Sequence, residues 1–131
     1  MSEPNAQIDT MDGHAALGRT RFLVRATISV AAGNEQKTNP ELAGRLQRAM
    51  AWVDADDFYF VIEHGKRCIY FLLTVAGTHE LPRIAEALWL GLDAEVEFLP
   101  AISQSDFERG RAAVDEVVAS FAPSVPVTAR E

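Results

Sequence analysis

Five side chains have the types and the spacing to form one chemically active cluster. They are an arginine, two tyrosines and two glutamates on predicted strands: Arg25, Tyr59, Tyr70, Glu95 and Glu97. Because alternate residues of a strand point to the same side of a sheet, we expect all five on one face. An arginine removed from water needs a carboxylate partner, so we expect Arg25 to pair with Glu95 or Glu97.

Two kinds of role are open to this cluster. In a functional role, Arg25 would hold an anionic ligand, and Tyr59 and Tyr70 would donate hydrogen bonds to it. Glu95 or Glu97 would act as general acid or base if burial in a cavity raised its pKa. In a structural role, the ion pair would only fix the register of strands or of a dimer, and the tyrosines would pack in an interface.

The other nucleophiles and metal ligands are scattered along the chain. His14, His64 and His79 do not have the spacing of metal ligands, and the sequence has no CxxC pair. Cys68 has no activating base that the sequence reveals. Neither GxGxxG nor GxxxxGK occurs. The sequence therefore predicts no metal site and no cofactor.

Two β-α-β units of nearly equal length must position the cluster. Apolar runs predict the strands, with alternation in the first and fourth strands and apolar residues on both faces of the second and third, and apolar stripes at helical spacing predict the helices. The predicted strands are Arg21–Val30, Asp57–His64, Arg67–Val75 and Ala94–Leu99, the predicted helices are Pro40–Val53 and His79–Leu90, and Ala31–Thr38 is predicted as a polar loop. This order predicts an α+β, ferredoxin-like βαββαβ fold, in which two helices cover one face of a four-stranded antiparallel sheet.

Cap and break residues set the expected ends of the helices. Asn39 precedes Pro40 as an N-cap, Thr78 is placed to cap the second helix, and Gly91 is expected to end it. A third helix is predicted over 105–121, because Ser105 and Glu108 have the spacing of a capping box.

The two faces of the predicted sheet differ in polarity. The face toward the helices is apolar throughout: Phe22, Val24, Ala26, Ile28, Phe58, Phe60, Ile62, Ile69, Phe71, Leu73, Val75, Val96 and Phe98. The opposite face mixes apolar and charged residues: Leu23, Arg25, Thr27, Tyr59, Val61, Glu63, Cys68, Tyr70, Leu72, Thr74, Glu95 and Glu97. It is too apolar for water and too charged for a dry core. We therefore expect the open faces of two subunits to close on each other in a homodimer.

Composition narrows the classes of partner. The formal net charge of −7 disfavours nucleic acid and anionic membranes, and no apolar run is long enough to span a bilayer. A single cysteine and an N-terminus without a signal-peptide pattern indicate a cytoplasmic protein. We expect a disordered arm over 1–19, one domain over 20–121 and a disordered tail over 122–131.

Four short segments resemble those of a known superfamily. They are Phe22-Leu-Val-Arg25, Glu41–Arg48 with Trp52 after it, Glu80–Leu88, and Asp93-Ala-Glu-Val-Glu97. Together they resemble the dimeric α+β barrel superfamily, and within it the muconolactone-isomerase-like proteins and related bacterial families of unassigned function. The resemblance implies sheet-to-sheet dimers with ligand cavities between helices and sheet.

Three functions are compatible with these expectations. The first is a dimeric barrel that binds a small organic ligand, such as an organic acid, or acts as an accessory protein. The second is a cofactor-independent isomerase or monooxygenase, with Glu95 or Glu97 as base and Arg25 holding an anionic substrate. The third is a regulatory ligand-binding module of the amino-acid-sensing type, which would normally accompany a catalytic domain.

Overall fold

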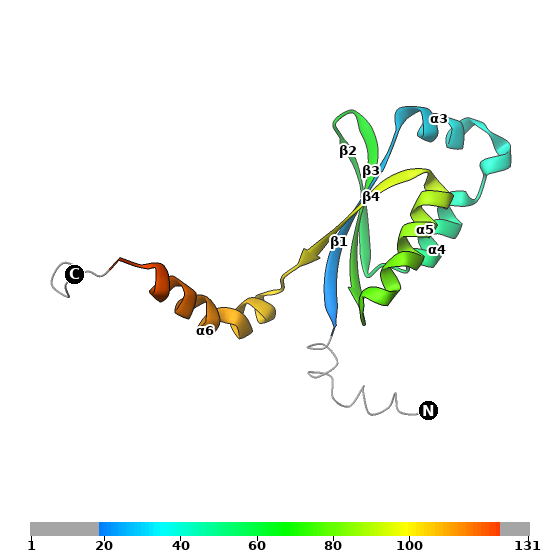
Figure 1. The fold of residues 1–131 in the computed structure, drawn as a ribbon. Helices are drawn as coiled ribbons and strands as arrows, with labels where there is room; N and C mark the ends of the chain where they lie inside the picture. The colour runs from blue at the N-terminus through cyan, green and yellow to red at the C-terminus, as the bar shows by residue number, and fades with distance from the viewer. Residues whose placement is uncertain (1–18, 124–131) are drawn as a thin grey trace, which may run out of the picture. The chain divides into compact units, whose positions relative to one another are not determined.

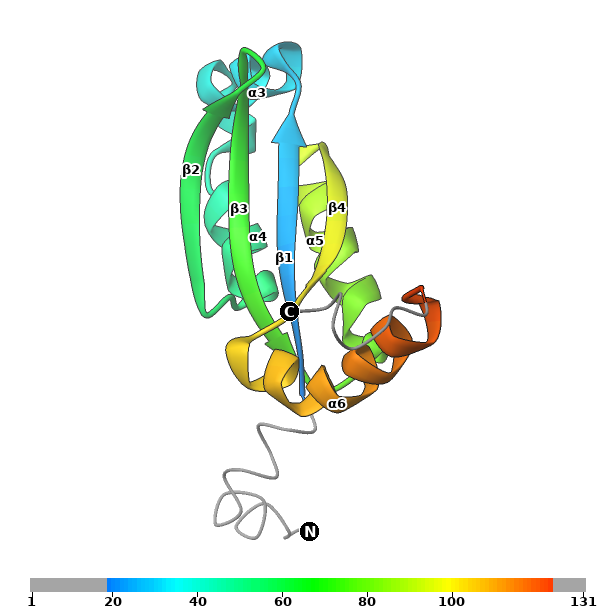
Figure 2. The same ribbon diagram turned by 90° about the vertical axis from the view of Figure 1, so that its left-hand side faces the viewer.

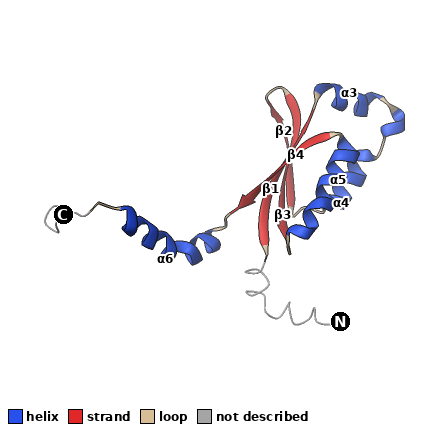
Figure 3. Cartoon of the chain, viewed as in Figure 1, coloured by secondary structure: helices blue, strands red, loops and turns tan. Residues whose placement is uncertain are grey.

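The computed structural model describes residues 19–123, which divide into two compact units at the Ala101–Ile102 boundary. The first unit contains β1 (Thr20–Ile28), α3 (Val30–Thr38), the 3₁₀ turn η1 (Pro40–Leu42), α4 (Arg45–Val53), β2 (Asp57–Glu63), β3 (Lys66–Val75), the 3₁₀ turn η2 (Thr78–Glu80), α5 (Leu81–Leu92) and β4 (Ala94–Ala101). The second unit contains α6 (Gln104–Phe121). Figures 1 and 3 show these elements.

One four-stranded antiparallel sheet organises the first unit, in the order β2-β3-β1-β4. Figure 2 looks onto its open face, with α4 and α5 behind it. Arg25 on β1 lies opposite Tyr70 on one side and Glu97 on the other. The predicted α+β class, with an antiparallel sheet and helices, is confirmed.

The core lies between this sheet and the two helices α4 and α5. Its buried cluster is Phe22, Val24, Ala26, Ile28, Ala49, Val53, Ile69, Phe71, Leu73, Val75, Ile84, Leu88, Leu92 and Ala94. Val96 and Phe98 are partly buried against it. The alternation along β1 and β3 therefore identified the core correctly on the two central strands.

The edge strand β2 departs from that prediction. Phe58, Phe60 and Ile62 were expected in the core, but they are 42%, 63% and 87% exposed. An edge strand has a neighbour on one side only, so fewer side chains surround its residues. Phe60 and Ile62 instead line a cavity, described below.

The predicted polar loop over Ala31–Thr38 is wrong, because this segment forms helix α3. Ser29 begins the helix by accepting a hydrogen bond from the backbone N–H of Ala32 at 3.0 Å. The segment has no apolar stripe, and therefore gave no periodic signal.

The predicted helix over Pro40–Val53 is interrupted. Asn39 caps only the short turn η1, by accepting from the N–H of Glu41 at 3.0 Å. Gly44 then takes a left-handed conformation with φ of 86°, and α4 begins after it.

The ends of α5 also differ from the prediction. Thr78 begins the turn η2 instead of capping α5, and α5 continues through Gly91 to Leu92. Asp93 ends it in a left-handed conformation with φ of 55°.

In the second unit, the capping box is formed by Ser103 and Asp106, two residues before the predicted pair. Of the predicted flanking segments 1–19 and 122–131, all but Arg19, Ala122 and Pro123 lie outside the described residues.

Candidate functional site

The open face of the sheet carries an ion pair at its centre. Arg25 Nε donates to Glu97 Oε1 at 2.8 Å, and Arg25 Nη2 contacts the same oxygen. Cross-strand register places these residues directly opposite each other. Of the two expected partners, Glu95 and Glu97, Arg25 therefore pairs with Glu97, which raises the pKa of the guanidinium.

A second carboxylate extends this ion pair into a network. Glu63 Oε2 lies 3.6 Å from Arg25 Nη1, and Glu63 Oε1 accepts a 2.7 Å hydrogen bond from Tyr70. The Tyr70 hydrogen bond, with help from the Arg25 charge, holds the pKa of Glu63 below its usual value. The same hydrogen bond raises the pKa of Tyr70. We call Arg25, Glu63, Tyr70 and Glu97 the open-face cluster.

Cys68 lies beside this cluster and is 2% exposed. Its Sγ is 3.7 Å from Glu63 Oε1 and 3.9 Å from Thr27 Oγ1. Burial raises the pKa of the thiol, which therefore stays protonated near neutral pH.

Two of the five predicted site residues lie apart from the cluster. Glu95 is exposed and faces Thr27 across the ladder, two register positions from the pair of Arg25 and Glu97. Tyr59 is 61% exposed and donates to Asp57 Oδ2 at 2.8 Å, which raises the pKa of its phenol. Sequence reasoning did not single out Glu63, although it alternates with Tyr59 and Val61 on the same face.

A cavity of about 340 Å³ lies on the other side of the sheet, between α3, α4 and the strands β2 and β3. We call it the helix–sheet cavity. Its lining is Ile28, Gly33, Gln36, Lys37, Leu46, Phe60, Val61, Ile62, Arg67, Cys68 and Ile69. Two cations, Lys37 and Arg67, therefore stand among mainly apolar side chains, and no carboxylate lines the cavity.

Arg67 is held in place at this cavity by two neighbours on α3. Its Nη2 donates to Asn34 Oδ1 at 3.2 Å. Its side chain also passes over Gly33, where a Cβ atom would overlap Arg67 Nη1. The glycine therefore makes room for the guanidinium.

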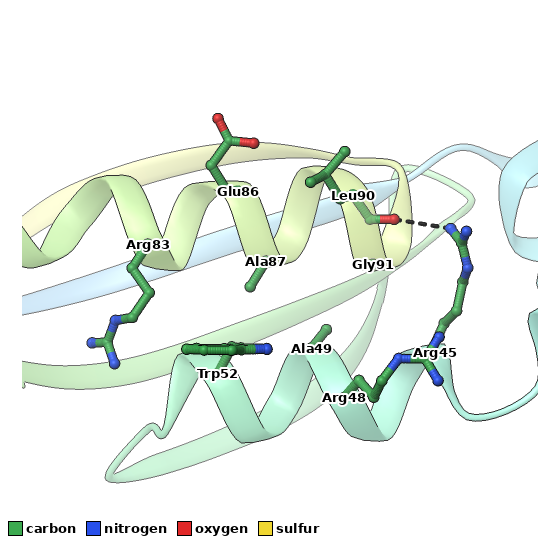
Figure 4. A pocket seen from close by; sticks show the side chains of 9 residues that line it. All are labelled: Arg45, Arg48, Ala49, Trp52, Arg83, Glu86, Ala87, Leu90 and Gly91. Atoms are coloured by element: carbon green, nitrogen blue, oxygen red, sulfur yellow. Dashed lines mark hydrogen bonds between the residues drawn. The ribbon is translucent and has the colours of Figure 1, made fainter.

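A second hollow of about 440 Å³ runs between α4 and α5, and Figure 4 shows its side chains. We call it the interhelical groove. Gly91 allows the helices to approach closely, since a Cβ there would lie 2.8 Å from that of Ala49. The groove is lined by Arg45, Arg48, Ala49, Trp52, Arg83, Glu86, Ala87, Leu90 and Gly91.

The cations of the interhelical groove are partly satisfied within the protein. Arg45 Nη1 donates to the backbone oxygen of Leu90 at 2.9 Å, and Arg83 forms a 3.3 Å ion pair with Glu80. Glu86 also lines the groove and would repel an anion. The helix–sheet cavity is therefore the better match for an organic acid.

No residue of the open-face cluster lines either hollow, and neither does Glu95. Sequence reasoning missed Lys37 and Arg67 as site residues. The sequence held no clear signal for them, because the segment containing Lys37 predicts a loop and the alternation on β2 assigns Phe60 and Ile62 to the core.

Within residues 19–123, no group of three or more His, Cys, Asp or Glu side chains is arranged to hold a metal ion. In the same range, no helix combines the length and the apolarity needed to cross a membrane. Comparisons with models of protein families, with curated proteins and with solved structures find no significant match.

Proposed function

We propose that this protein binds a small organic acid in the helix–sheet cavity. The observation that carries the proposal is the pairing of two cations, Lys37 and Arg67, with an apolar lining that includes no carboxylate. Ligand sites of this kind combine an apolar surface with a few polar groups that fix orientation. The volume of about 340 Å³ suits a small ligand.

Each part of the cavity has a role in this proposal. Leu46, Phe60 and Ile62 contact the hydrocarbon body of the acid, which covers apolar surface that water would otherwise touch. Arg67 uses one nitrogen for Asn34 and keeps further N–H groups for the carboxylate. The proposal contains no catalytic step, because neither Glu95 nor Glu97 lines the cavity.

A calorimetric titration with a panel of short aliphatic and aromatic monocarboxylates tests the proposal. We expect Arg67→Gln to weaken binding by about tenfold or more, since a hydrogen bond to a charged group is worth ~1.5–3 kcal/mol. Arg48→Gln, in the interhelical groove, is the matched control and should leave binding within about twofold. Equal losses in both variants, or equal affinity for amines of the same shape, would contradict the proposal.

We further infer that the sheet has the ferredoxin-like topology and that its open face closes on a second copy of the chain. The strand order β2-β3-β1-β4 and the position of α4 and α5 behind the sheet support the topology. The apolar part of the open face supports the dimer, because Leu23, Val61 and Leu72 are only half-buried within one protomer. This arrangement is also what the resemblance to dimeric α+β barrels implies.

The open-face cluster fits such an interface. Arg25, the cation of the cluster, contacts both Glu63 and Glu97, so the arginine enters the interface with its charge already compensated. A stable interface of standard size buries about 1,200–2,000 Å² in total, which a four-stranded face can supply.

A further inference from the structure

We propose that α6 pairs with the α6 of a second copy as a parallel two-stranded coiled coil. This proposal rests on the proposed homodimer and names a second contact between the same two chains.

The apolar residues of α6 follow a heptad. Phe107, Val114 and Phe121 recur at intervals of seven, which makes them a positions. Gly110 and Val117 then fall at the d positions between them. Phe107, Val114 and Val117 are 52%, 48% and 56% exposed, so this seam is open to a partner.

Outside the a and d positions, most of the surface of α6 is polar or small. The b, c and f positions are charged or small: Ser105, Glu108, Arg109, Ala112, Asp115, Glu116 and Ala119. Val118, an e residue that is 60% exposed, widens the apolar stripe on one side of the seam.

The length and burial of α6 also require a partner. The helix has 18 residues and none of them is buried. Most helical stability in proteins comes from packing an apolar face against a partner. The capping box of Ser103 and Asp106 secures one end of α6 but buries no apolar surface.

The charges beside the seam select the parallel direction. Asp106 is a g residue and Arg111 is the e residue five positions later, which is the spacing of interhelical ion pairs in parallel coils. Two-fold symmetry creates this pair twice. An antiparallel coil would place g against g and e against e, and would form neither pair.

Both charged groups lie beside the seam. The guanidinium of Arg111 lies 5.5 Å from the centre of the Phe107 ring, so it already sits beside an a residue. Asp106 is held in its charged form by Arg109, which lowers the pKa of the carboxyl. Asp106 Oδ1 accepts from Arg109 at 2.9 Å on the same helix.

Disulfide cross-linking of the full chain in a Cys68→Ser background tests the pairing. In a parallel coil, Val114 lies next to its own copy, so Val114→Cys should cross-link at least ten times faster than Ala119→Cys at an f position. Equal rates, or no cross-link in Val114→Cys, would overturn the coiled coil.

Sedimentation of the unmodified chain distinguishes a failure of the α6 pairing from a failure of the proposed sheet dimer. A dimer without a Val114→Cys cross-link would overturn only the α6 pairing. A monomer at micromolar concentration would overturn the proposed homodimer and the coiled coil together.

Substitution of Gly110 gives a test without cysteine. A Cβ there meets no atom within 4 Å, so a side chain can be added. Gly110→Ala removes the glycine penalty, whereas Gly110→Leu also fills the d layer. We expect Gly110→Leu to lower the dimer dissociation constant at least fivefold relative to Gly110→Ala. Equal constants would contradict the proposal.

Discussion

The two faces of the sheet are built from the same alternating strands but end in different environments. On the face toward α4 and α5, Val24 and Phe71 are fully buried, and neighbouring apolar side chains complete the core. On the open face, the intervening residues Arg25 and Tyr70 form part of an ion-pair network and stay partly exposed. The first face is largely completed by the chain itself, and we propose that the second face closes on another copy of the chain.

The difference shows where binding surfaces can arise in so small a fold. On the helix side, the helix–sheet cavity lies where α3 and α4 meet the edge strand β2. The open side has a continuous semi-apolar surface, which suits a protein partner better than a small ligand. We therefore assign the acid to one face and the second copy to the other.

The largest effect should come from truncating the core face. Phe71 is fully buried, so Phe71→Ala should lower the free energy of unfolding by about 3–5 kcal/mol. Leu72→Ala, one residue away on the open face, should instead weaken the dimer, so its cost in the free energy of unfolding should shrink as the protein is diluted. Urea unfolding at two protein concentrations measures both effects. If Leu72→Ala lowered the free energy of unfolding by the same amount at both protein concentrations, the two faces would not differ as we describe.

The next effect concerns binding of the acid in the helix–sheet cavity. A methyl group at Gly33 would displace the flexible end of Arg67, so Gly33→Ala should weaken binding of the acid about tenfold. Stability should change little, because alanine suits the interior of α3. Titration calorimetry and circular dichroism check the two statements. Unchanged affinity of Gly33→Ala for the acid would show that Arg67 does not contribute to binding.

A smaller effect should separate the two glutamates of β4. Glu97→Gln removes the charge that Arg25 contacts and should raise the dimer dissociation constant roughly fivefold. Glu95→Gln should leave it within about twofold, since Glu95 faces Thr27 instead. Sedimentation of the two variants gives the constants. A larger rise of the dimer dissociation constant in Glu95→Gln than in Glu97→Gln would show that the open-face cluster does not contact the partner.

The smallest effect is a dependence on pH. The folded-state pKa of Glu63 is lowered, so its stabilisation is fully present above its unfolded pKa of about 4.3 and is lost as the pH falls through the folded value. Tyr70→Phe removes the main cause of that shift. The difference in Tm between wild type and variant should therefore be largest near neutral pH and shrink on acidification. A constant difference down to about pH 3 would contradict this assignment.

Much of the fold could be predicted because the strands alternate cleanly. The pattern of β1 and β3 identified their buried residues, and all four strands end within two residues of the expected positions. The segment 31–38 could not be predicted as a helix, because its formation depends on the Ser29 cap and not on an apolar stripe. The conformation of Gly44 likewise interrupted a helix that its flanking residues favoured.

The candidate sites were predictable to different degrees. Pairing of Arg25 with a glutamate of β4 was predictable from the sequence, but the choice of Glu97 over Glu95 depends on the cross-strand register. The helix–sheet cavity depends on α3, whose residues Gly33 and Asn34 position Arg67 from a distant part of the chain. Because that helix was read as a loop, the contact between these segments could not be anticipated.

Sedimentation velocity with an ultraviolet-absorbing aryl carboxylate tests the division between the two faces most directly, since one run reports both oligomeric state and bound ligand. Wild type and Leu90→Asp, an exposed leucine on α5, should sediment as dimers, and Leu72→Asp should sediment as a folded monomer. All three should carry the acid, because its cavity lies on the helix side. A monomeric wild type, or loss of the acid together with the dimer in Leu72→Asp, would contradict the account.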